Sequence, residues 1–275
     1  MRAAALEEMI SYLDSLKYSF VPLEECMRQT KKCGVAITFD DGFRDVYTDA
    51  YPVLRQHNIP FTVFLTTSTV GSTRLLWLHK LYLSLDRVPK AKWVELCRGL
   101  DPSIPATDSA SIILDHIIHN CDPALLKSLV SKMACEAGIC EIEEQAMARK
   151  LSLTQAQLSE MAEGGLAIEA HGHEHWSLPT LDRQQTSSEI SVCLDAIESG
   201  FGKRPAFYAP AYGRMNSYLH EYATKEEAVE LVSTEMGIIK SGVARQYVPR
   251  LMTTSVLDLS FVLFRLYLHG NNCIR

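Results

Sequence analysis

The sequence predicts an α/β protein in which a parallel, barrel-like sheet is surrounded by helices and interrupted by a long helical insertion. Short apolar runs alternate along the chain with segments of helical periodicity, a pattern typical of parallel sheets built from βαβ units. Two of these runs end abruptly in carboxylates or imidazoles, as strands do at the active-site end of a barrel. Residues 74–150 show helical spacing with little strand character, which marks them as the insertion.

The first half of the chain contains two predicted strands. Residues 35–39 (VAITF) form a β-branched run that stops at Asp-Asp-Gly, and residues 60–66 (PFTVFLT) form a continuous apolar run typical of a buried parallel strand. Helices are predicted over 5–17, 23–32 and 45–57, the last containing a proline that should kink it.

The second half repeats the alternation of helices and strands. A capping box of Thr154 and Gln157 opens a helix that a Gly-Gly pair ends, and residues 166–170 (LAIEA) form a strand that runs into His171. The remaining predicted elements are a helix over 183–199, a strand over 206–209, and helices over 224–232 and 256–269.

Length and composition exclude several classes of protein. With 275 residues, 47% of them hydrophobic, the chain can bury a sizeable core, and we expect one domain over 1–275. The net charge of −6 and the lack of a basic run argue against nucleic-acid binding, which depends on phosphate neutralisation. No window approaches about 18 uncharged apolar residues, so no transmembrane segment is expected.

The N-terminus and the cysteines favour a cytoplasmic protein. Two acidic residues stand where a signal peptide would carry its apolar core, so residues 1–16 are expected to form an amphipathic helix. The eight cysteines lack CxxC spacing, and we expect reduced, buried thiols rather than disulfides or a zinc site.

The first candidate for chemistry is the pair Asp40-Asp41 at the end of a predicted strand. Two ionised carboxylates close together raise each other's pKa, so a cation or a division of roles is expected. A metal held by one carboxylate and a proton taken by the other would satisfy that requirement. The alternative is an ordinary Asp-Gly turn after a strand.

The second candidate is the run His171-Gly-His173-Glu-His175, which follows another predicted strand. Imidazole is a common nitrogen ligand of divalent metals. Either His171 and His173 bind on one strand face, or His171 and His175 converge where Gly172 bends the chain. The alternative is a solvated histidine loop. Together the two candidates supply one carboxylate and two imidazoles, which is the ligand set of a hydrolytic zinc-type site. The second carboxylate of the Asp40-Asp41 pair could then act as a general base.

Residues 38–42 (TFDDG) resemble the first signature of the polysaccharide deacetylases. The resemblance implies a distorted, partly open (β/α) barrel in which Asp40 is the catalytic base and Asp41 binds the metal. The segment 171–178 is similar to the family's H-x-x-x-H motif, which implies His171 and His175 as ligands and leaves His173 as a neighbour.

Residues 207–213 (FYAPAYG) resemble a variant of the family's third motif. The resemblance implies that the backbone amide of Ala211 or Tyr212 holds the oxyanion, and it places Tyr208 where the family has an arginine that orients the base. We expect Trp176, Tyr208 and Pro210 to line the sugar-binding groove, with ordinary packing as the alternative.

Other parts of the chain depart from the family pattern. The only match to the Leu-x-His motif of the catalytic acid is His269, in a segment that looks helical. Residues 248–251 (VPRL) resemble the C-terminal pattern of biosynthetic, exopolysaccharide-type members. These members usually begin with an apolar strand, whereas this sequence starts at a helix. Either the strand is absent, which would leave the barrel open at that edge, or the given start of the sequence is too late.

The leading hypothesis is a metal-dependent hydrolase that removes an N-acetyl group from an amino sugar in a glycan or lipid-linked sugar. Zinc is expected from the ligand types, although nickel, cobalt or iron would accept the same set. Two alternatives are a C–N hydrolase acting on a formamide or cyclic amide, and a degenerate, non-catalytic scaffold. An exposed apolar face of the insertion would allow a homo-oligomer.

Overall fold

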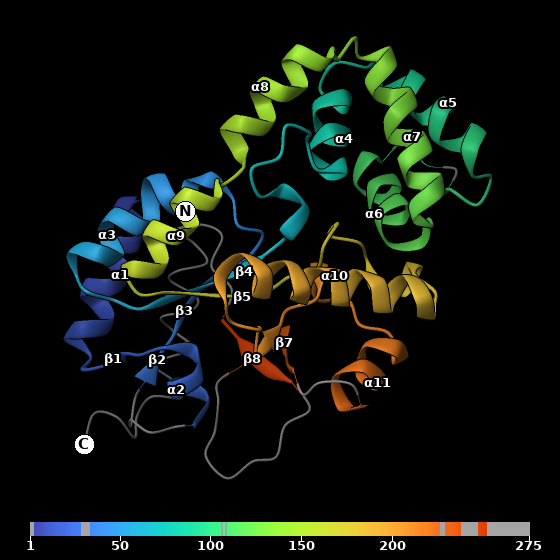
Figure 1. Ribbon diagram of the computed structural model, residues 1–275. Coiled ribbons are helices and arrows are strands. Elements are labelled where there is room, and N and C mark those ends of the chain that lie inside the picture. The colour runs from blue at the N-terminus through green and yellow to red at the C-terminus, as the bar shows by residue number, and fades with distance from the viewer. Residues whose placement is uncertain are drawn as a thin grey trace.

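The computed structural model describes residues 3–28, 34–105, 107, 109–225, 229–237 and 247–251, and a parallel sheet forms its centre (Figure 1). Its six strands lie in the order of the sequence, and every neighbouring pair is parallel. They are β3 (Ile37–Phe39), β4 (Phe61–Leu65), β5 (Leu166–Ala170), β6 (Phe207–Tyr208), β7 (Glu230–Met236) and β8 (Val248–Arg250). A separate parallel pair consists of β1 (Ser19–Phe20) and β2 (Gly34–Val35).

Helices cover the outer face of this sheet (Figure 1). Two of them pack directly on β5, namely α9 (Gln155–Glu163) and α10 (Arg183–Phe201). The other α-helices outside the insertion, within the described residues, are α1 (Ala3–Ser15), α2 (Leu23–Arg28), α3 (Tyr51–Gln56) and α11 (Ser217–Lys225), with a π-helical turn, η1 (Val46–Ala50), before α3.

Side chains on the two faces of the sheet enter different apolar clusters. Along β4, Phe61, Val63 and Leu65 join the main core under the helices, whereas Phe64 points into a smaller cluster. That smaller cluster consists of Leu23, Phe64, Phe207, Ala209, Val232 and Val248. Alternate residues of a strand face opposite sides, so the smaller cluster fills the inside of the curled sheet.

The sheet curls until its two edge strands face each other without pairing as strands. Arg250, the last residue of β8, donates two hydrogen bonds to Asp40, which follows β3. The strand order has β3 and β8 at its two ends. The structure therefore confirms the expected α/β fold with a partly open, barrel-like sheet.

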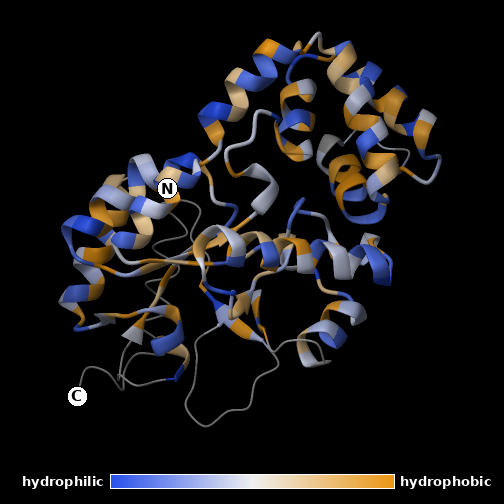
Figure 2. Ribbon diagram, in the orientation of Figure 1, coloured by the Kyte–Doolittle hydropathy of each residue, from blue (hydrophilic) through white to orange (hydrophobic). Residues whose placement is uncertain are grey.

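Five helices between β4 and α9 form a layer of their own over the end of the sheet (Figure 1). They are α4 (Trp77–Leu85), α5 (Lys90–Leu100), α6 (Ala110–Asn120), α7 (Pro123–Glu136) and α8 (Glu141–Leu151). They bury residues such as Ile113, Ile117 and Met133 completely. Hydrophobic residues concentrate in the central strands, whereas these helices carry both polar and apolar residues (Figure 2).

Two side chains of the insertion, Trp77 and His119, contact the histidine-rich loop. The ring of Trp77 stacks on Trp176 at 5.1 Å between centroids, and its Nε1 donates to the carbonyl of Glu174 at 2.9 Å. On α6, Nδ1 of His119 lies 3.2 Å from Oγ of Ser177. The insertion is thus a wall of the region where the candidate site residues gather.

The helix predicted over 224–232 is wrong. The structure places α11 at Ser217–Lys225 and a strand, β7, at Glu230–Met236. The local composition favours a helix, but Leu231 and Val232 are buried in the sheet between β6 and β8. Tertiary pairing therefore overrides the local helix propensity of this segment.

Other sequence-based predictions agree with the structure to different degrees. The capping box of Thr154 and Gln157 is present at the start of α9. The strand predicted over 35–39 is divided between β2 and β3, which belong to different sheets. The predicted helix over 256–269 lies outside the described residues. Cysteines in the described part of the chain are free thiols, and no helix there is long and apolar enough to cross a membrane.

Candidate metal centre

The motif residues follow the carboxyl ends of three parallel strands of the same sheet, β3, β5 and β6. Asp40 and Asp41 come directly after β3, His171 directly after β5, and Tyr212 shortly after β6. Because the carboxyl ends of parallel strands meet at one edge of a barrel, residues far apart in the sequence converge there. The chain between Asp41 and His171 contains β4 and the whole insertion.

The carboxylate of Asp41 lies beside two imidazole rings. Its Oδ1 is 3.2 Å from Nε2 of His171 and 2.9 Å from Nε2 of His175. Zinc ligands about 2.0–2.1 Å from a tetrahedral ion are about 3.3 Å from one another, so this spacing suits one shared metal. The residues therefore fit the divalent metal that the resemblance implies, and three protein ligands leave one position open.

Neighbouring groups affect the orientation and the protonation state of these three side chains. Nδ1 of His171 donates to the carbonyl of Ala209 at 2.6 Å, which leaves Nε2 to bind a metal. Burial lowers the pKa of His175 and so favours the neutral imidazole that a metal requires. Burial alone would raise the pKa of Asp41, but hydrogen bonds from His171 and His175 hold that pKa well below its usual range.

The structure places two of the three histidines of this loop beside Asp41, which favours the second of the two predicted arrangements. His171 and His175 converge on Asp41, whereas Nδ1 of His173 lies 2.9 Å from Oγ1 of Thr67. His173 is therefore outside the ligand cluster, and its ring joins the loop to the segment that follows β4.

Backbone strain occurs at three candidate site residues. Asp41, His175 and Tyr212 have φ angles of 70°, 59° and 58°, a region that residues with a Cβ rarely occupy. Strain of this kind costs about 1–3 kcal/mol per residue and persists only where surrounding contacts fix the conformation. Three of the five non-glycine residues with positive φ in the described chain thus belong to this centre.

A buried carboxylate on α10 holds the histidine loop in place. Glu189 accepts the N–H of Glu174 at 2.8 Å and also interacts with the amides of His173 and Trp176. Burial raises the pKa of Glu189 to about 7. Gly172, at φ 94°, permits the approach, because a Cβ there would lie 2.7 Å from Oε1 of Glu189. Sequence reasoning missed Glu189, whose only signal was an acidic residue on the apolar face of its helix.

Asp40, next to the ligand Asp41, forms a bidentate ion pair with Arg250. Nη1 of Arg250 is 2.6 Å from Oδ1 of Asp40, and Nη2 is 2.9 Å from Oδ2. Burial alone would raise the pKa of Asp40, but His171 and the Arg250 guanidinium outweigh it and keep that pKa below its usual value. Asp40 is therefore ionised and oriented, as a general base must be.

This contact corrects the expectation for Tyr208. The resemblance placed Tyr208 where the family's arginine would orient the base, but the partner of Asp40 is Arg250 on β8. Tyr208 is only 1% exposed and packs in the main core. Sequence reasoning singled out residues 248–251 as a subgroup pattern but assigned them no role, because nothing in the sequence shows that β8 curls back to β3.

The expected sugar contacts are buried in the structure. Trp176 is 7% exposed, and its ring lies between Trp77 and the ammonium of Lys127. Tyr208 and Pro210 are also buried. Their role in sugar binding stays a prediction, and in this structure these side chains pack inside the protein.

Tyr212 lies between a metal-ligand histidine and the insertion. Its ring is 4.7 Å from the ring of His175 and 5.0 Å from that of His119, measured between centroids, and it meets both edge-on. Among the described residues its buried hydroxyl has no hydrogen-bond partner. Gly213, at φ 65°, follows it at a position where a Cβ would lie 2.1 Å from Oγ1 of Thr234. The backbone that carries the Ala211 and Tyr212 amides is thus fixed beside the histidines.

A second insertion histidine also faces this region. The ring of His79 on α4 lies 4.8 Å from that of Phe43, two residues beyond Asp41. The charges of Asp41 and His175 act on His79, although burial is the main reason that its pKa is lowered. His269, the one match to the family's Leu-x-His motif, lies outside the described residues.

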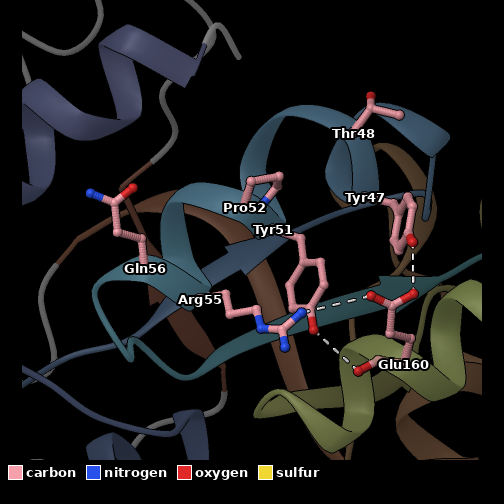
Figure 3. A pocket seen from close by; sticks show the side chains of 7 residues that line it. All are labelled: Tyr47, Thr48, Tyr51, Pro52, Arg55, Gln56 and Glu160. Atoms are coloured by element: carbon pink, nitrogen blue, oxygen red, sulfur yellow. Dashed lines mark hydrogen bonds and ion pairs between the residues drawn. The ribbon is translucent and has the colours of Figure 1, made fainter.

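A surface hollow of about 710 Å³ lies elsewhere, between η1, α3 and α9 (Figure 3). Glu160 projects into it, accepts a hydrogen bond from the Tyr47 hydroxyl at 2.7 Å and is 3.9 Å from Arg55. None of the motif residues lines it, so it is separate from the metal centre.

The geometry defines a class of protein, an α/β fold with a curled parallel sheet and a cluster of Asp41, His171 and His175 that could hold a metal at the carboxyl ends of its strands. The sequence pattern of the polysaccharide deacetylase family matches residues 27–228. The chain belongs to this family.

Individual relatives agree with this assignment. YxkH of Bacillus subtilis (strain 168) is 23% identical over 221 residues, covering 80% of this chain and 51% of YxkH. The poly-beta-1,6-N-acetyl-D-glucosamine N-deacetylase of Staphylococcus epidermidis is 35% identical over 82 residues, 28% of this chain and 27% of that protein. The chain thus spans about half or less of these relatives.

Solved structures show the same fold. IcaB from Ammonifex degensii aligns with a TM-score of 0.60 and 15% identity over 95% of this chain and 88% of its own. The structure of the deacetylase PplD of Streptococcus pyogenes in complex with acetate aligns with a TM-score of 0.59 and 16% sequence identity. The alignment covers 94% of this chain and 86% of PplD.

The ligand set predicts which histidines control metal binding. Replacing His175 by Gln should remove one equivalent of bound zinc per chain, because it leaves only two protein ligands. Replacing His173 by Gln is the matched control in the same loop and should leave the zinc content unchanged. Elemental analysis after dialysis measures both, and loss of zinc from the His173 variant but not the His175 variant would contradict the assignment.

Proposed function

We propose that this protein is a metal-dependent hydrolase that removes the N-acetyl group from an amino sugar in a glycan or lipid-linked sugar. The observation that carries the proposal is the cluster of Asp41, His171 and His175 beside the ionised carboxylate of Asp40. This arrangement joins a three-ligand metal site to a positioned base, which is what hydrolysis of an unactivated amide requires.

The residues have distinct roles in this mechanism. Asp41, His171 and His175 would hold a divalent metal, which would supply Lewis-acid polarisation of the amide carbonyl and activation of water. Asp40 takes the proton of the attacking water, and Arg250 keeps its carboxylate ionised and aimed. The amides of Ala211 and Tyr212 stabilise the negative charge that develops on the acetyl oxygen.

Two observations support an N-acetylated sugar as substrate. The chain belongs to the polysaccharide deacetylase family, and a curated relative is named as a poly-beta-1,6-N-acetyl-D-glucosamine N-deacetylase. The net charge of −6 offers no general attraction for an anionic glycan, so a neutral or lipid-linked N-acetylglucosamine compound fits better. Zinc is the proposed metal from the ligand types, with nickel, cobalt and iron as further candidates.

The direct test is acetate release from N-acetylglucosamine oligomers by the zinc-loaded protein. The wild type should release acetate, and Asp40→Asn should lower kcat by about 10²–10⁴-fold while zinc binding persists, because only the base is removed. N-formylated oligomers serve as a parallel substrate. Faster release of formate would favour the formamide hydrolase, and no turnover of either substrate by a zinc-loaded, folded protein would favour a scaffold.

The ion pair between Asp40 and Arg250 predicts a shift in pH dependence. Without Arg250 the pKa of the buried Asp40 rises, so the base becomes protonated at a higher pH. In Arg250→Gln the acidic limb of the kcat/KM profile should therefore move up by about one pH unit or more. Arg250→Lys keeps the charge but not the fork of two hydrogen bonds, and its shift should be smaller. An unmoved acidic limb in Arg250→Gln would show that Arg250 does not control the base.

We also propose His79 as the proton donor to the leaving amine. Of the three insertion histidines, His79, His116 and His119, only His79 is acted on by the charges of Asp41 and His175, and it packs on Phe43, two residues beyond Asp41. His119 instead lies against Tyr212 and Ser177.

Replacing His79 by Gln should lower kcat by about 10²-fold and remove the alkaline limb of its pH profile, with KM and zinc content unchanged. His119→Gln is the comparison variant and should keep that limb. If the two variants behave in the opposite way, the proton comes from His119 rather than His79.

A further inference from the structure

A second group of metal-binding side chains lies inside the helical insertion, away from the Asp41 cluster. Asp101 directly follows α5, His116 lies on α6, and Cys121 directly follows α6. One ligand atom from each of the three lies within 4.8 Å of the other two. The family motifs include none of these residues.

The spacing within this group suits a zinc ion. Sγ of Cys121 is 3.5 Å from Oδ2 of Asp101, and Nε2 of His116 is 3.9 Å from the same oxygen. A tetrahedral zinc about 2.3 Å from sulfur and 2.0 Å from a carboxylate oxygen separates those two atoms by about 3.5 Å. The imidazole nitrogen of His116 would need to approach that oxygen by about 0.6 Å to reach the spacing of about 3.3 Å expected around a tetrahedral zinc.

The two oxygens of Asp101 have different partners. Oδ1 accepts the backbone N–H of Ser103 at 2.8 Å, which orients the carboxylate. Oδ2 faces both Cys121 and His116, two side chains that also ligate zinc in other proteins. Carboxylates that bind metals are commonly oriented by a hydrogen bond to the oxygen that does not face the metal. Asp101 has this arrangement, because Ser103 binds Oδ1 and two potential metal ligands surround Oδ2.

The Cys121 side chain is buried, whereas solvent reaches the other two members of the group. Burial raises the pKa of the Cys121 thiol to about 12, so a metal must displace the thiol proton in order to bind the sulfur. Cys121 is 5% exposed, and it shares an apolar interior space with the side chain of Cys97. The side chains of Asp101 and His116 are each 20% exposed, so a water molecule can reach the fourth position of the ion.

We propose that Asp101, His116 and Cys121 form a second divalent-metal site of the zinc type, which ties the end of α5 to α6. Binding replaces the thiol proton, since Zn²⁺ forms a bond to sulfur and H⁺ is released to solvent. Because α6 packs against the segment Leu178–Thr180 beside the histidine loop, the site holds the wall that faces the catalytic metal. The proposal does not depend on deacetylase activity.

Cobalt is a probe that separates the two sites. The Asp41 cluster has no sulfur ligand, whereas Cys121 would give a thiolate-to-cobalt charge-transfer band in the near ultraviolet. The full-length protein is stripped of metal under reducing conditions and titrated with Co²⁺. Two equivalents should bind, and one of them should produce this band.

Variants assign the band to the proposed ligands. Cys121→Ser should lose the band and one equivalent of cobalt, whereas Asp41→Asn should keep the band and lose the other equivalent. Cys140→Ser changes an exposed cysteine of the same insertion and should keep both. If Cys121→Ser does not fold, His116→Gln is used, and its affinity at this site should fall at least about tenfold. A wild type without the band, or a band that persists in Cys121→Ser, would overturn the proposal.

Discussion

The convergence of two histidine rings on the carboxylate of Asp41 is the interaction on which the rest of the site depends. It requires β3 and β5 to end at the same edge of the sheet with β4 between them. It also requires two residues with a Cβ to adopt positive φ angles. The surrounding contacts must offset that strain, and the carboxylate of Glu189 and the carbonyl of Ala209 contribute to this by fixing the loop and the His171 ring.

The curl of the sheet also brings Arg250 on β8 to Asp40, which follows β3. An open parallel sheet of this order would leave β3 and β8 far apart, but the apolar cluster inside the curl brings them within reach of one ion pair. Arg250 then balances the negative charge of the Asp40 carboxylate, and the Asp41 carboxylate interacts with His171 and His175. Two adjacent carboxylates thus acquire different partners, which is the physical solution to placing two acidic groups side by side.

The helical insertion forms one side of the candidate site, and the sequence motifs of the family do not include it. Trp77 and His119 attach it to the loop between β5 and α10, so the helices are coupled to the ligand residues instead of forming a separate appendage. A metal between α5 and α6 would stiffen this wall from within. The helical insertion therefore contacts the proposed catalytic site through Trp77 and His119, and it contains the proposed second metal site.

The sequence by itself determined the alternating architecture, the capping box at α9 and the position of the ligands at strand ends. These features depend on local periodicity and on short motifs, which a linear sequence contains in full. Tertiary structure decided the remainder: that 230–236 is a strand, that Arg250 rather than Tyr208 meets Asp40, and that Trp176 is covered. It also brought Cys121 to Asp101 and His116, although no spacing rule joins them. Each of these outcomes depends on which distant segments become neighbours, and that is set by the curl of the sheet and the docking of the insertion rather than by any local run of residues.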